Sequence, residues 1–251
     1  MKALITGASS GIGKDIAVYL ASMGIDLIIV GRRKENLEDL KKNLNVKVKV
    51  IPLDLSEFDN VEELYNEVRK DNIDILVNNA GFGLFGEFSK TDIETEMKMI
   101  NVNIKQVHYL TKMFLRDFIK KDKGYILNVA SSAGFMAGPK LSTYYATKNY
   151  VLRLTEAIYE ELKMNGSNVH ISALCPGPVD TEFNKVAHGE FHTKAATSEY
   201  VAKYAIDKMF KNKLIIIPTI KMKLAIFFTR LVPTKLLLRI TYNIQDRKTR
   251  K

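Results

Sequence analysis

Short apolar runs rich in Val and Ile alternate in this sequence with longer stretches of helical periodicity, and this alternation constrains the fold more than any other feature. The expected strands are residues 2–6, 26–30, 47–51, 73–77, 124–130, 168–174 and 214–217. The expected helices lie near residues 11–23, 34–44, 58–70, 92–120, 142–165 and 198–211. Strands that are apolar on both faces and are separated by helices predict right-handed βαβ units. The expected fold class is therefore α/β, a doubly wound parallel sheet with helices on both faces and a ligand crevice at the carboxyl ends of its strands.

Capping residues precede three of the expected helices. They are Ser56-Glu57, Thr91-Asp92 and Ser198-Glu199. The sequence contains no internal repeat, no low-complexity tract and no linker, so one domain is favoured. We expect residues 1–213 to form the catalytic and cofactor-binding domain. Residues 214–251 would add the last strand and a basic amphipathic C-terminal extension, within the same domain or appended to it.

The composition is that of an ordinary globular protein, with 46% hydrophobic and 26% charged residues. The single cysteine, Cys175, excludes an intramolecular disulfide and a cysteine-based metal site. We expect it to be a small buried apolar side chain in a protein of a reducing compartment. The first residues run directly into an expected strand without a signal-peptide pattern, which favours a cytoplasmic location.

The net charge of +10 resides entirely in the C-terminal segment. Residues 211–251 contain eleven Lys or Arg and one acid, Asp246, so that residues 1–210 are balanced at 27 basic and 27 acidic. This distribution does not predict a nucleic-acid partner, because basic residues would then be expected on a folded face.

The same C-terminal segment is apolar but repeatedly interrupted by Lys, Arg and Pro, and is too broken to span a bilayer. Leu224, Phe227, Phe228 and Leu231 recur at helical spacing. Three alternatives follow for residues 221–251: a cover over the substrate pocket or a subunit interface, a basic amphipathic helix in peripheral contact with the anionic inner membrane surface, or a binder of another polyanion.

A glycine-rich turn between the first expected strand and helix predicts a dinucleotide site. Its sequence is Thr6-Gly7-Ala8-Ser9-Ser10-Gly11-Ile12-Gly13. Gly7 suits a tight turn, Gly11 lets backbone approach a pyrophosphate, and Gly13 permits close packing of helix on strand. The helix N-terminus offers free N–H groups to phosphates.

The end of the second expected strand favours NADP(H) over NAD(H). Arg32 and Arg33 follow it at the place where NAD-binding proteins tend to have an acid for the ribose hydroxyls. A guanidinium binds a 2′-phosphate bidentately. We expect Arg32 to contribute more than Arg33.

With these motifs in order, the chain resembles the short-chain dehydrogenase/reductase family over residues 2–210. The further motifs are Asp54-Leu55, Asn78-Asn79-Ala80-Gly81, Tyr144-x-x-x-Lys148 and Pro176-Gly177-Pro178-Val179-Asp180-Thr181. The resemblance implies a Rossmann-type fold and a set of cofactor contacts. These expected contacts are Gly7, Ser9, Ser10, Gly11, Ile12, Gly13, Arg32, Arg33, Asp54, Leu55, Asn78, Ala80, Gly81, Tyr144, Lys148, Pro176, Gly177, Val179 and Thr181.

Within that set, the resemblance gives several residues particular tasks. Asp54 would contact the adenine, and Asn78, Ala80 and Gly81 would shape the adenine-ribose side of the crevice. Val179 and Thr181 would hold the nicotinamide carboxamide. For Asn79 we expect a structural hydrogen bond between strands instead.

Tyr144 and Lys148 are four residues apart and share one face of a helix. A phenol has a pKa near ~10, too high for a base at neutral pH, and a nearby ammonium favours its ionised form. The pair is therefore typical of general acid/base chemistry. Tyr145 is the neighbouring alternative, and the spacing to Lys148 selects Tyr144.

The resemblance adds Ser131 and Asn103 to the catalytic set. Counting back from Tyr144 selects Ser131 over Ser132, and its hydroxyl would stabilise charge on the substrate oxygen. Counting to Thr111 selects Asn103 over Asn101, as the holder of a water in a proton relay toward Lys148. The chain departs from the family at Gln106, where glycine is common, and at Tyr145, where a small residue is common.

These observations predict an NADP(H)-dependent oxidoreductase that reduces a ketone or aldehyde, or oxidises the matching alcohol, and that is a homo-oligomer. Aromatic residues near the expected crevice suggest an apolar substrate. The four histidines have no metal-ligand spacing, and no metal site is expected. Two alternatives stay open: a membrane-associated protein that senses dinucleotides on the same scaffold, and an NADP-dependent enzyme of another reaction type, such as an epimerase or dehydratase.

Overall fold

The computed structural model describes residues 1–183 and 195–249. Within these residues a seven-stranded sheet has the order β3-β2-β1-β4-β5-β6-β9, and every neighbouring pair is parallel. The strands are β1 (Lys2–Thr6), β2 (Asp26–Gly31), β3 (Val48–Pro52), β4 (Ile75–Asn78), β5 (Gly124–Val129), β6 (Val169–Leu174) and β9 (Ile215–Ile216). The expected fold class is confirmed, and β4 and β9 are shorter than the apolar runs that predicted them.

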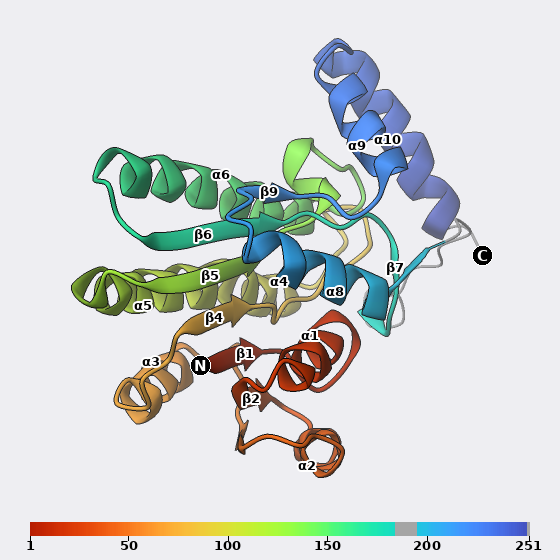
Figure 1. The fold of residues 1–251 in the computed structure, drawn as a ribbon. Helices are drawn as coiled ribbons and strands as arrows, with labels where there is room; N and C mark the ends of the chain where they lie inside the picture. The colour runs from red at the N-terminus through yellow and green to blue at the C-terminus, as the bar shows by residue number, and fades with distance from the viewer. Residues whose placement is uncertain (184–194, 250–251) are drawn as a thin grey trace.

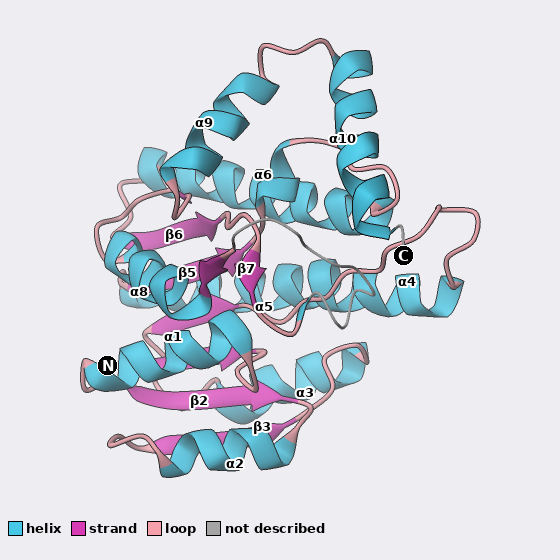
Figure 2. Ribbon diagram, turned by 90° about the vertical axis from the view of Figure 1, so that its right-hand side faces the viewer, coloured by secondary structure: helices cyan, strands magenta, loops and turns pink. Residues whose placement is uncertain are grey.

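Helices cover both faces of the sheet (Figures 1 and 2). One face carries α1 (Gly11–Ser22), α2 (Lys34–Lys42) and α8 (Ser198–Met209). The other carries α3 (Phe58–Val68), α5 (Val107–Lys121) and α6 (Ser142–Met164). Successive strand residues alternate between these two layers, because side chains of a strand point to opposite faces in turn.

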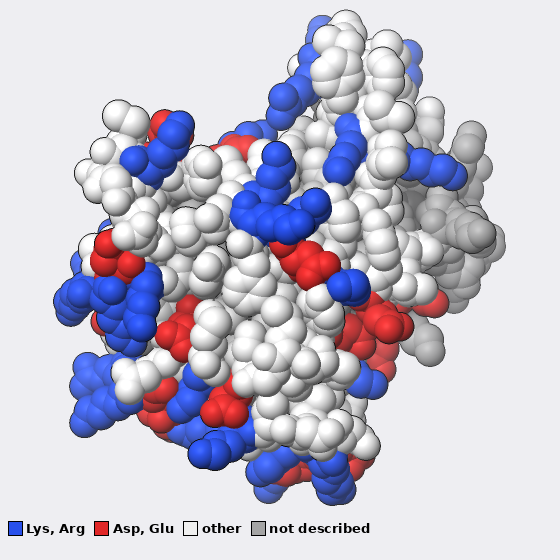
Figure 3. All heavy atoms as spheres, viewed as in Figure 1, with Lys and Arg blue, Asp and Glu red and all other residues white. Residues whose placement is uncertain are grey.

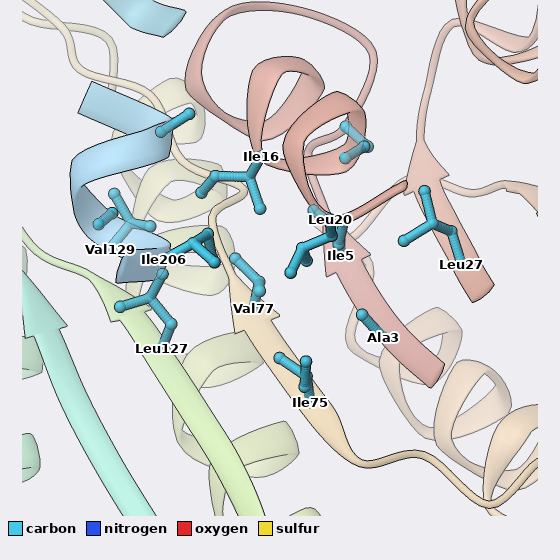
Figure 4. Packing of buried hydrophobic residues seen from close by; sticks show 14 of the residues in the cluster. Ala3, Ile5, Ile16, Leu20, Leu27, Ile75, Val77, Leu127, Val129 and Ile206 are labelled. Atoms are coloured by element: carbon cyan, nitrogen blue, oxygen red, sulfur yellow. The ribbon is translucent and has the colours of Figure 1, made fainter. Parts of the chain in front are cut away.

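The packing on the first face is shown in Figure 4. Ile16 and Leu20 of α1 and Ile206 of α8 lie over the strands, and all three side chains are fully buried. Beneath them Ile5 of β1 and Val77 of β4 are likewise inaccessible to solvent. β1 and β4 are therefore fixed as neighbours although about 70 residues separate them.

The adjacency of β1 and β4 positions the site. β2 and β3 extend the sheet on one side of β1, and β4, β5, β6 and β9 extend it on the other. The chain reverses its direction of winding between β1 and β4, and a crevice forms at the carboxyl ends of the strands at such a point.

The expected helix over residues 92–120 has a more complex structure. It consists of α4 (Ile93–Ile100), a π-helical stretch η1 (Asn101–Gln106) and α5. Asp92 caps α4 as expected, since its carboxylate accepts a 2.8 Å hydrogen bond from the Thr95 N–H. The wider π-turn was not predicted, because the apolar pattern continues through it.

Two other expected helix starts differ in detail. α3 begins at Phe58 after Glu57, and no side chain caps it. α8 is capped by Thr197, whose hydroxyl accepts from the Tyr200 N–H, and Ser198 is already its first residue. Two short elements were also not predicted: the 3-10 turn η2 (Ser132–Phe135), and a second parallel pairing between β7 (Val179–Asp180) and β8 (Ala196–Thr197).

The C-terminal segment forms two helices, α9 (Ile220–Thr229) and α10 (Thr234–Thr249), which project from the body as a hairpin (Figure 1). The strand β9 that precedes them pairs with β6 and so belongs to the main sheet. In the part of the chain that the structure describes, no helix combines the length and the apolar character needed to cross a bilayer.

Candidate active site

A cavity of about 790 Å³ lies at the carboxyl ends of the parallel strands. Its wall is formed by the turns that follow β1, β2, β3, β4, β5 and β6, by α6, and by one residue of α10. Most of the site residues expected from the sequence meet in this wall. They are Gly7, Ser9, Ser10, Gly11, Ile12, Arg32, Arg33, Asp54, Leu55, Ala80, Gly81, Ser131, Tyr144, Lys148, Pro176, Gly177, Val179 and Thr181.

The glycine turn after β1 has the geometry of a phosphate cradle. Gly7 and Gly11 have φ of 67° and 53°, in the left-handed region that favours glycine. A Cβ on Gly13 would lie 2.4 Å from the carbonyl oxygen of Gly7, so Gly13 is a packing residue behind the cavity. Ser10 caps α1 without a side-chain hydrogen bond, which leaves the first N–H groups of the helix available to an anion.

Arg32 and Arg33 line the cavity at the end of β2 but differ in their contacts. Arg33 forms an ion pair with Glu182 at 2.8 Å, and its guanidinium also lies 3.4 Å from the Ser9 hydroxyl. Arg32 is exposed and makes no ion pair with a described acidic residue. Both guanidinium groups therefore border the cavity, and the one that is engaged in a described ion pair is that of Arg33.

Asp54 and Leu55 lie in the wall after β3, as expected. The Asp54 carboxylate accepts a 2.9 Å hydrogen bond from the Ser56 N–H, which fixes the turn.

Asn78 is not in the cavity wall, which corrects the expectation of a direct part in the crevice. It is 1% exposed, and its amide donates to Thr111 and Asn128 and accepts from Gln106. As the last residue of β4 it points to the α5 side of the sheet. Asn79 is the one that lines the cavity, and its amide donates to the Thr6 and Gly7 carbonyls at 3.0 Å, as a structural bond between strands would.

Tyr144 and Lys148 lie together in the cavity wall on α6, and the Lys148 ammonium is 5.8 Å from the centre of the Tyr144 ring. Burial raises the pKa of Tyr144 to about 12, against the opposing effect of its hydrogen bond with Ser131. Burial lowers the pKa of Lys148 to about 8. The lowering of the Tyr144 pKa that was expected from Lys148 is thus absent, because loss of solvent dominates and the opposing influence comes from Ser131.

The choice of Tyr144 over Tyr145, and of Ser131 over Ser132, agrees with these contacts. Ser131 is the serine that interacts with the Tyr144 phenol, and its oxygen also accepts from the Ala133 N–H at 3.1 Å. Tyr145 is turned away to α10, where its hydroxyl meets the Gln245 amide at 2.6 Å.

Asn103 lies behind the cavity wall in the π-helical stretch and is fully buried. Its amide pairs with the backbone N–H and C=O of Phe82 and donates to the Thr147 hydroxyl. A Cβ on Gly81 would lie 3.0 Å from the Asn103 oxygen and 3.3 Å from the Lys148 nitrogen, so both polar atoms border the space that Gly81 leaves open. Asn101 instead donates to the Ser56 carbonyl.

The segment after β6 closes the cavity. Pro176, Gly177, Val179 and Thr181 are all in the wall, and Thr181 packs against Gly11 of the phosphate turn. Residues 182–197, which follow this segment, are described only at their ends. His188 and His192 lie outside the described residues.

Several wall residues were not predicted, and one of them, Gln245, comes from the C-terminal hairpin. Gln245 of α10 is 3% exposed and reaches the cavity beside Tyr145, 100 positions earlier in the sequence. Its amide nitrogen meets the Tyr145 hydroxyl, while its amide oxygen is buried without a hydrogen-bond partner. Only tertiary structure brings these residues together, so no local sequence pattern could have identified Gln245.

The remaining reactive groups do not form a second site among the described residues. Cys175 is fully buried, which confirms its expected place, and burial raises its pKa to about 12. No cluster of three or more His, Cys, Asp or Glu residues with metal-binding geometry occurs in the described part of the chain.

Comparison with known proteins agrees with this geometry. The family model for short chain dehydrogenases matches residues 1–190. An uncharacterised oxidoreductase of Staphylococcus epidermidis is 34% identical over 181 residues, which covers 71% of this chain and 78% of that protein.

Solved structures show the same fold. A short-chain dehydrogenase from Sphingobium yanoikuyae in complex with NADPH has a TM-score of 0.82 and 29% identity, over 87% of this chain and 88% of that one. A bulky-bulky ketone specific alcohol dehydrogenase from Comamonas testosteroni has a TM-score of 0.78 and 27% identity, over 92% of each chain. Structures of this fold hold NADPH in some cases and NAD in others. The chain is an oxidoreductase that belongs to the short-chain dehydrogenase family.

Proposed function

We propose that the protein is an NADP(H)-dependent reductase of ketones or aldehydes in which Tyr144 is the general acid. One observation carries the proposal: Tyr144, Ser131 and Lys148 line the same cavity as the phosphate cradle at the N-terminus of α1. The cavity therefore has room for a dinucleotide at one end and for a carbonyl compound beside the phenol.

The residues present fit a dinucleotide with a 2′-phosphate. The glycine turn leaves the N–H groups of α1 free for the pyrophosphate, and Asp54 and Leu55 border the adenosine end. Arg32 and Arg33 supply positive charge there. Arg32 would be the main contact for the extra phosphate, because Arg33 is already paired with Glu182.

The proton chemistry follows from burial. With a pKa raised to about 12, the Tyr144 phenol holds its proton at neutral pH, the form needed to protonate a carbonyl oxygen during reduction. Ser131 would donate a hydrogen bond to the same oxygen as negative charge develops on it. The nicotinamide supplies the hydride when it is bound, and its positive charge after transfer favours the ionised phenol that is left.

Reprotonation of Tyr144 needs a path from the interior. The Lys148 ammonium donates to the Val129 carbonyl at 2.7 Å and also borders the space beside Gly81. Asn103 borders the same space with its amide oxygen. A water held there by Asn103 would pass protons to Lys148, and Lys148 would also hold the nicotinamide ribose.

The substrate end of the cavity is mainly apolar. Leu141, Phe82 and Phe183 line it around Tyr144, and the Tyr145 hydroxyl and the Gln245 amide are polar groups at its edge. The Gln245 amide oxygen is buried without a partner, so a turn of the side chain toward the cavity would let it accept a hydrogen bond from a donor on the substrate. We therefore propose a bulky apolar carbonyl compound that carries a hydroxyl or N–H distant from the reacting carbon.

The proposal is tested by following NADPH absorbance with a panel of apolar ketones and aldehydes. Tyr144→Phe should bind NADPH normally and lose nearly all turnover, by a factor of about 10² or more. The affinities of the Arg32→Ala and Arg33→Ala proteins for NADP⁺ and NAD⁺ test the cofactor assignment. A Tyr144→Phe protein with full activity would falsify the mechanism, and equal losses for both cofactors would remove the phosphate contact.

A further inference from the structure

The hairpin of α9 and α10 has an unusual distribution of polarity. The side chains that it turns toward the body include Thr241 and Gln245 of α10, which are 4% and 3% exposed. Three apolar side chains of α10, Leu236, Ile240 and Ile244, are turned away from the body and are all exposed. These three are spaced by four residues, so they form one stripe along the helix. A surface helix of a globular protein has the reverse arrangement, with its apolar face on the body and its polar face toward water.

α9 continues the apolar surface. Its exposed side chains recur at helical spacing and together leave a larger area open than those of α10. They are Ile220, Leu224, Phe227, Phe228 and, just beyond the helix, Leu231. Only Ile226 of α9 is buried. We call the exposed apolar residues of both helices and the turn between them the hairpin surface.

Positive charge surrounds the hairpin surface. Lys221, Arg230, Lys235 and Arg239 are exposed, and none makes an ion pair with a described acidic residue. The one acid of the segment, Asp246, is bound to Lys140 at the base of α10. On the face drawn in Figure 3, the projecting part of the hairpin has uncharged atoms bordered by Lys and Arg.

Charge distinguishes between the partners that could cover such a surface. A second copy docked by the same surface would bring like cations face to face, because a two-fold interface places each patch against itself. A neutral apolar partner would offer no negative charge to the surrounding Lys and Arg side chains. Both features are satisfied at once by a bilayer with anionic headgroups, where apolar side chains enter the headgroup boundary and Lys and Arg meet phosphates.

We propose that the hairpin surface docks the protein on the surface of a bilayer that contains anionic lipid. The apolar residues lie in the headgroup region, and the surrounding cations select the lipid charge. The helices rest in the interface without crossing the bilayer, in agreement with the absence of a spanning helix among the described residues. Docking is independent of catalysis, because no residue of the hairpin surface lies in the cavity wall. Gln245 of α10 does lie in the wall, but it is buried and attaches α10 to the body.

The sequence offers a direct probe, because the chain contains no tryptophan. Phe228 is 57% exposed in the hairpin surface and Phe88 is 67% exposed on the body, so Phe228→Trp and Phe88→Trp give matched single-tryptophan proteins. We expect vesicles of phosphatidylcholine and phosphatidylglycerol to shift the Phe228→Trp emission to shorter wavelength, and brominated lipid to quench it. Phe88→Trp should respond to neither.

Co-sedimentation of the full chain with the same vesicles tests charge and apolar area separately. Arg230→Gln and Lys235→Gln should each weaken binding about fivefold, and Lys112→Gln on α5 should leave it unchanged. Phe227→Gln with Leu231→Gln should weaken binding to every anionic vesicle. Raised salt should weaken wild-type binding as well.

Three results would overturn the proposal. The first is wild-type protein that stays in the supernatant with anionic vesicles. The second is binding that the hairpin substitutions do not change. The third is sedimentation equilibrium showing a dimer that dissociates in Phe227→Gln, which would assign the hairpin surface to a second copy. Far-UV circular dichroism of each variant checks that the fold is retained, and since NADPH is left out, failure of the enzymatic proposal would not alter the outcome.

Discussion

Tyr144 and Lys148 lose solvent together, and the loss acts on them in opposite directions. Burial favours the neutral form of each, so the pKa of the phenol rises to about 12 and that of the ammonium falls to about 8. Without cofactor, Tyr144 therefore binds its proton tightly, and Lys148 binds its own proton more weakly than a free lysine does. Because the pKa of Lys148 is the lower of the two, a relay in which Lys148 returns a proton to the ionised Tyr144 is favoured.

Cofactor binding should depend on pH through Lys148. Its lowered pKa means that the ammonium loses its charge as the pH rises through about 8, well before a free lysine would, and NADPH affinity should fall over that range. Tyr144, with the higher pKa, stays protonated there. Fluorescence titration of NADPH across this range measures the effect, and an affinity that stays constant up to the ordinary lysine pKa of 10.5 would show that the ribose contact does not need the charge.

Gly81→Ala should interrupt the relay. The added methyl group would fill the space bordered by the Asn103 oxygen and the Lys148 nitrogen, and the backbone at Gly81 is not in the left-handed region. We expect kcat to fall about tenfold or more with little change in Tm. Comparison with Asn103→Ala and the double variant checks the route, because effects on one path are not additive. Unchanged turnover in Gly81→Ala would argue against a water at this place.

The sequence predicts these residues unevenly. Tyr144, Lys148 and Ser131 follow from motif spacing and do meet in the cavity. The place of Asn78 was wrong because the last residue of a strand can face either side, and only the register of β4 between β1 and β5 decides which. Gln106, the departure from the family pattern, donates to Asn78 from the core. Its effect is on packing behind the cavity.

The long helical region over residues 92–121 shows what periodicity cannot reveal. A π-turn shifts the helix face by part of a turn, so that Asn103 faces the cavity side while Thr111 faces the core. Apolar residues continue on both sides of η1, and the sequence therefore predicts one uninterrupted helix. Strands β1, β2 and β5 were predicted within a residue of their ends, because turn residues and charged side chains bound them.

The start of α8 gives a test of local capping. Thr197→Ala removes the hydroxyl that accepts from the Tyr200 N–H and should lower the free energy of unfolding by about 1 kcal/mol. For a chain of this length the expected change in Tm is about 2–4 °C, measured by differential scanning calorimetry. Ser198→Ala, one residue along, is the matched control and should have little effect. A larger loss in the Ser198→Ala protein would move the cap back to the residue that the sequence favoured.

At the scale of the whole molecule, two regions of different charge form the two ends of the cavity. The end of the cavity that contains the glycine turn is formed by residues between Gly7 and Gly81, which belong to the charge-balanced residues 1–210. The other end is closed by a helix from the strongly basic segment. The contact between them includes Met222 of α9 against Gly177, and the hydrogen bond between Gln245 and Tyr145.

Gln245→Leu tests whether that contact selects the substrate. The change removes the buried amide and leaves the phosphate cradle and the arginines untouched, so NADPH affinity should be retained. For substrates with a distal hydroxyl or N–H, KM should rise about tenfold, and for purely apolar ketones it should stay the same or fall. Steady-state kinetics on matched pairs of ketones make the comparison. Equal changes in both series would assign Gln245 to the attachment of α10 only.

The family model ends at residue 190, and the projecting hairpin lies wholly beyond it. Under the proposed mechanism, Tyr144, Ser131 and Lys148 therefore come from the part of the chain that the family model covers, and among the described wall residues Gln245 comes from beyond it. If Gln245 selects the substrate, such a division makes the C-terminal helices an exchangeable cassette. A chimera that carries this hairpin on another member should then gain the preference for substrates with a distal hydroxyl or N–H.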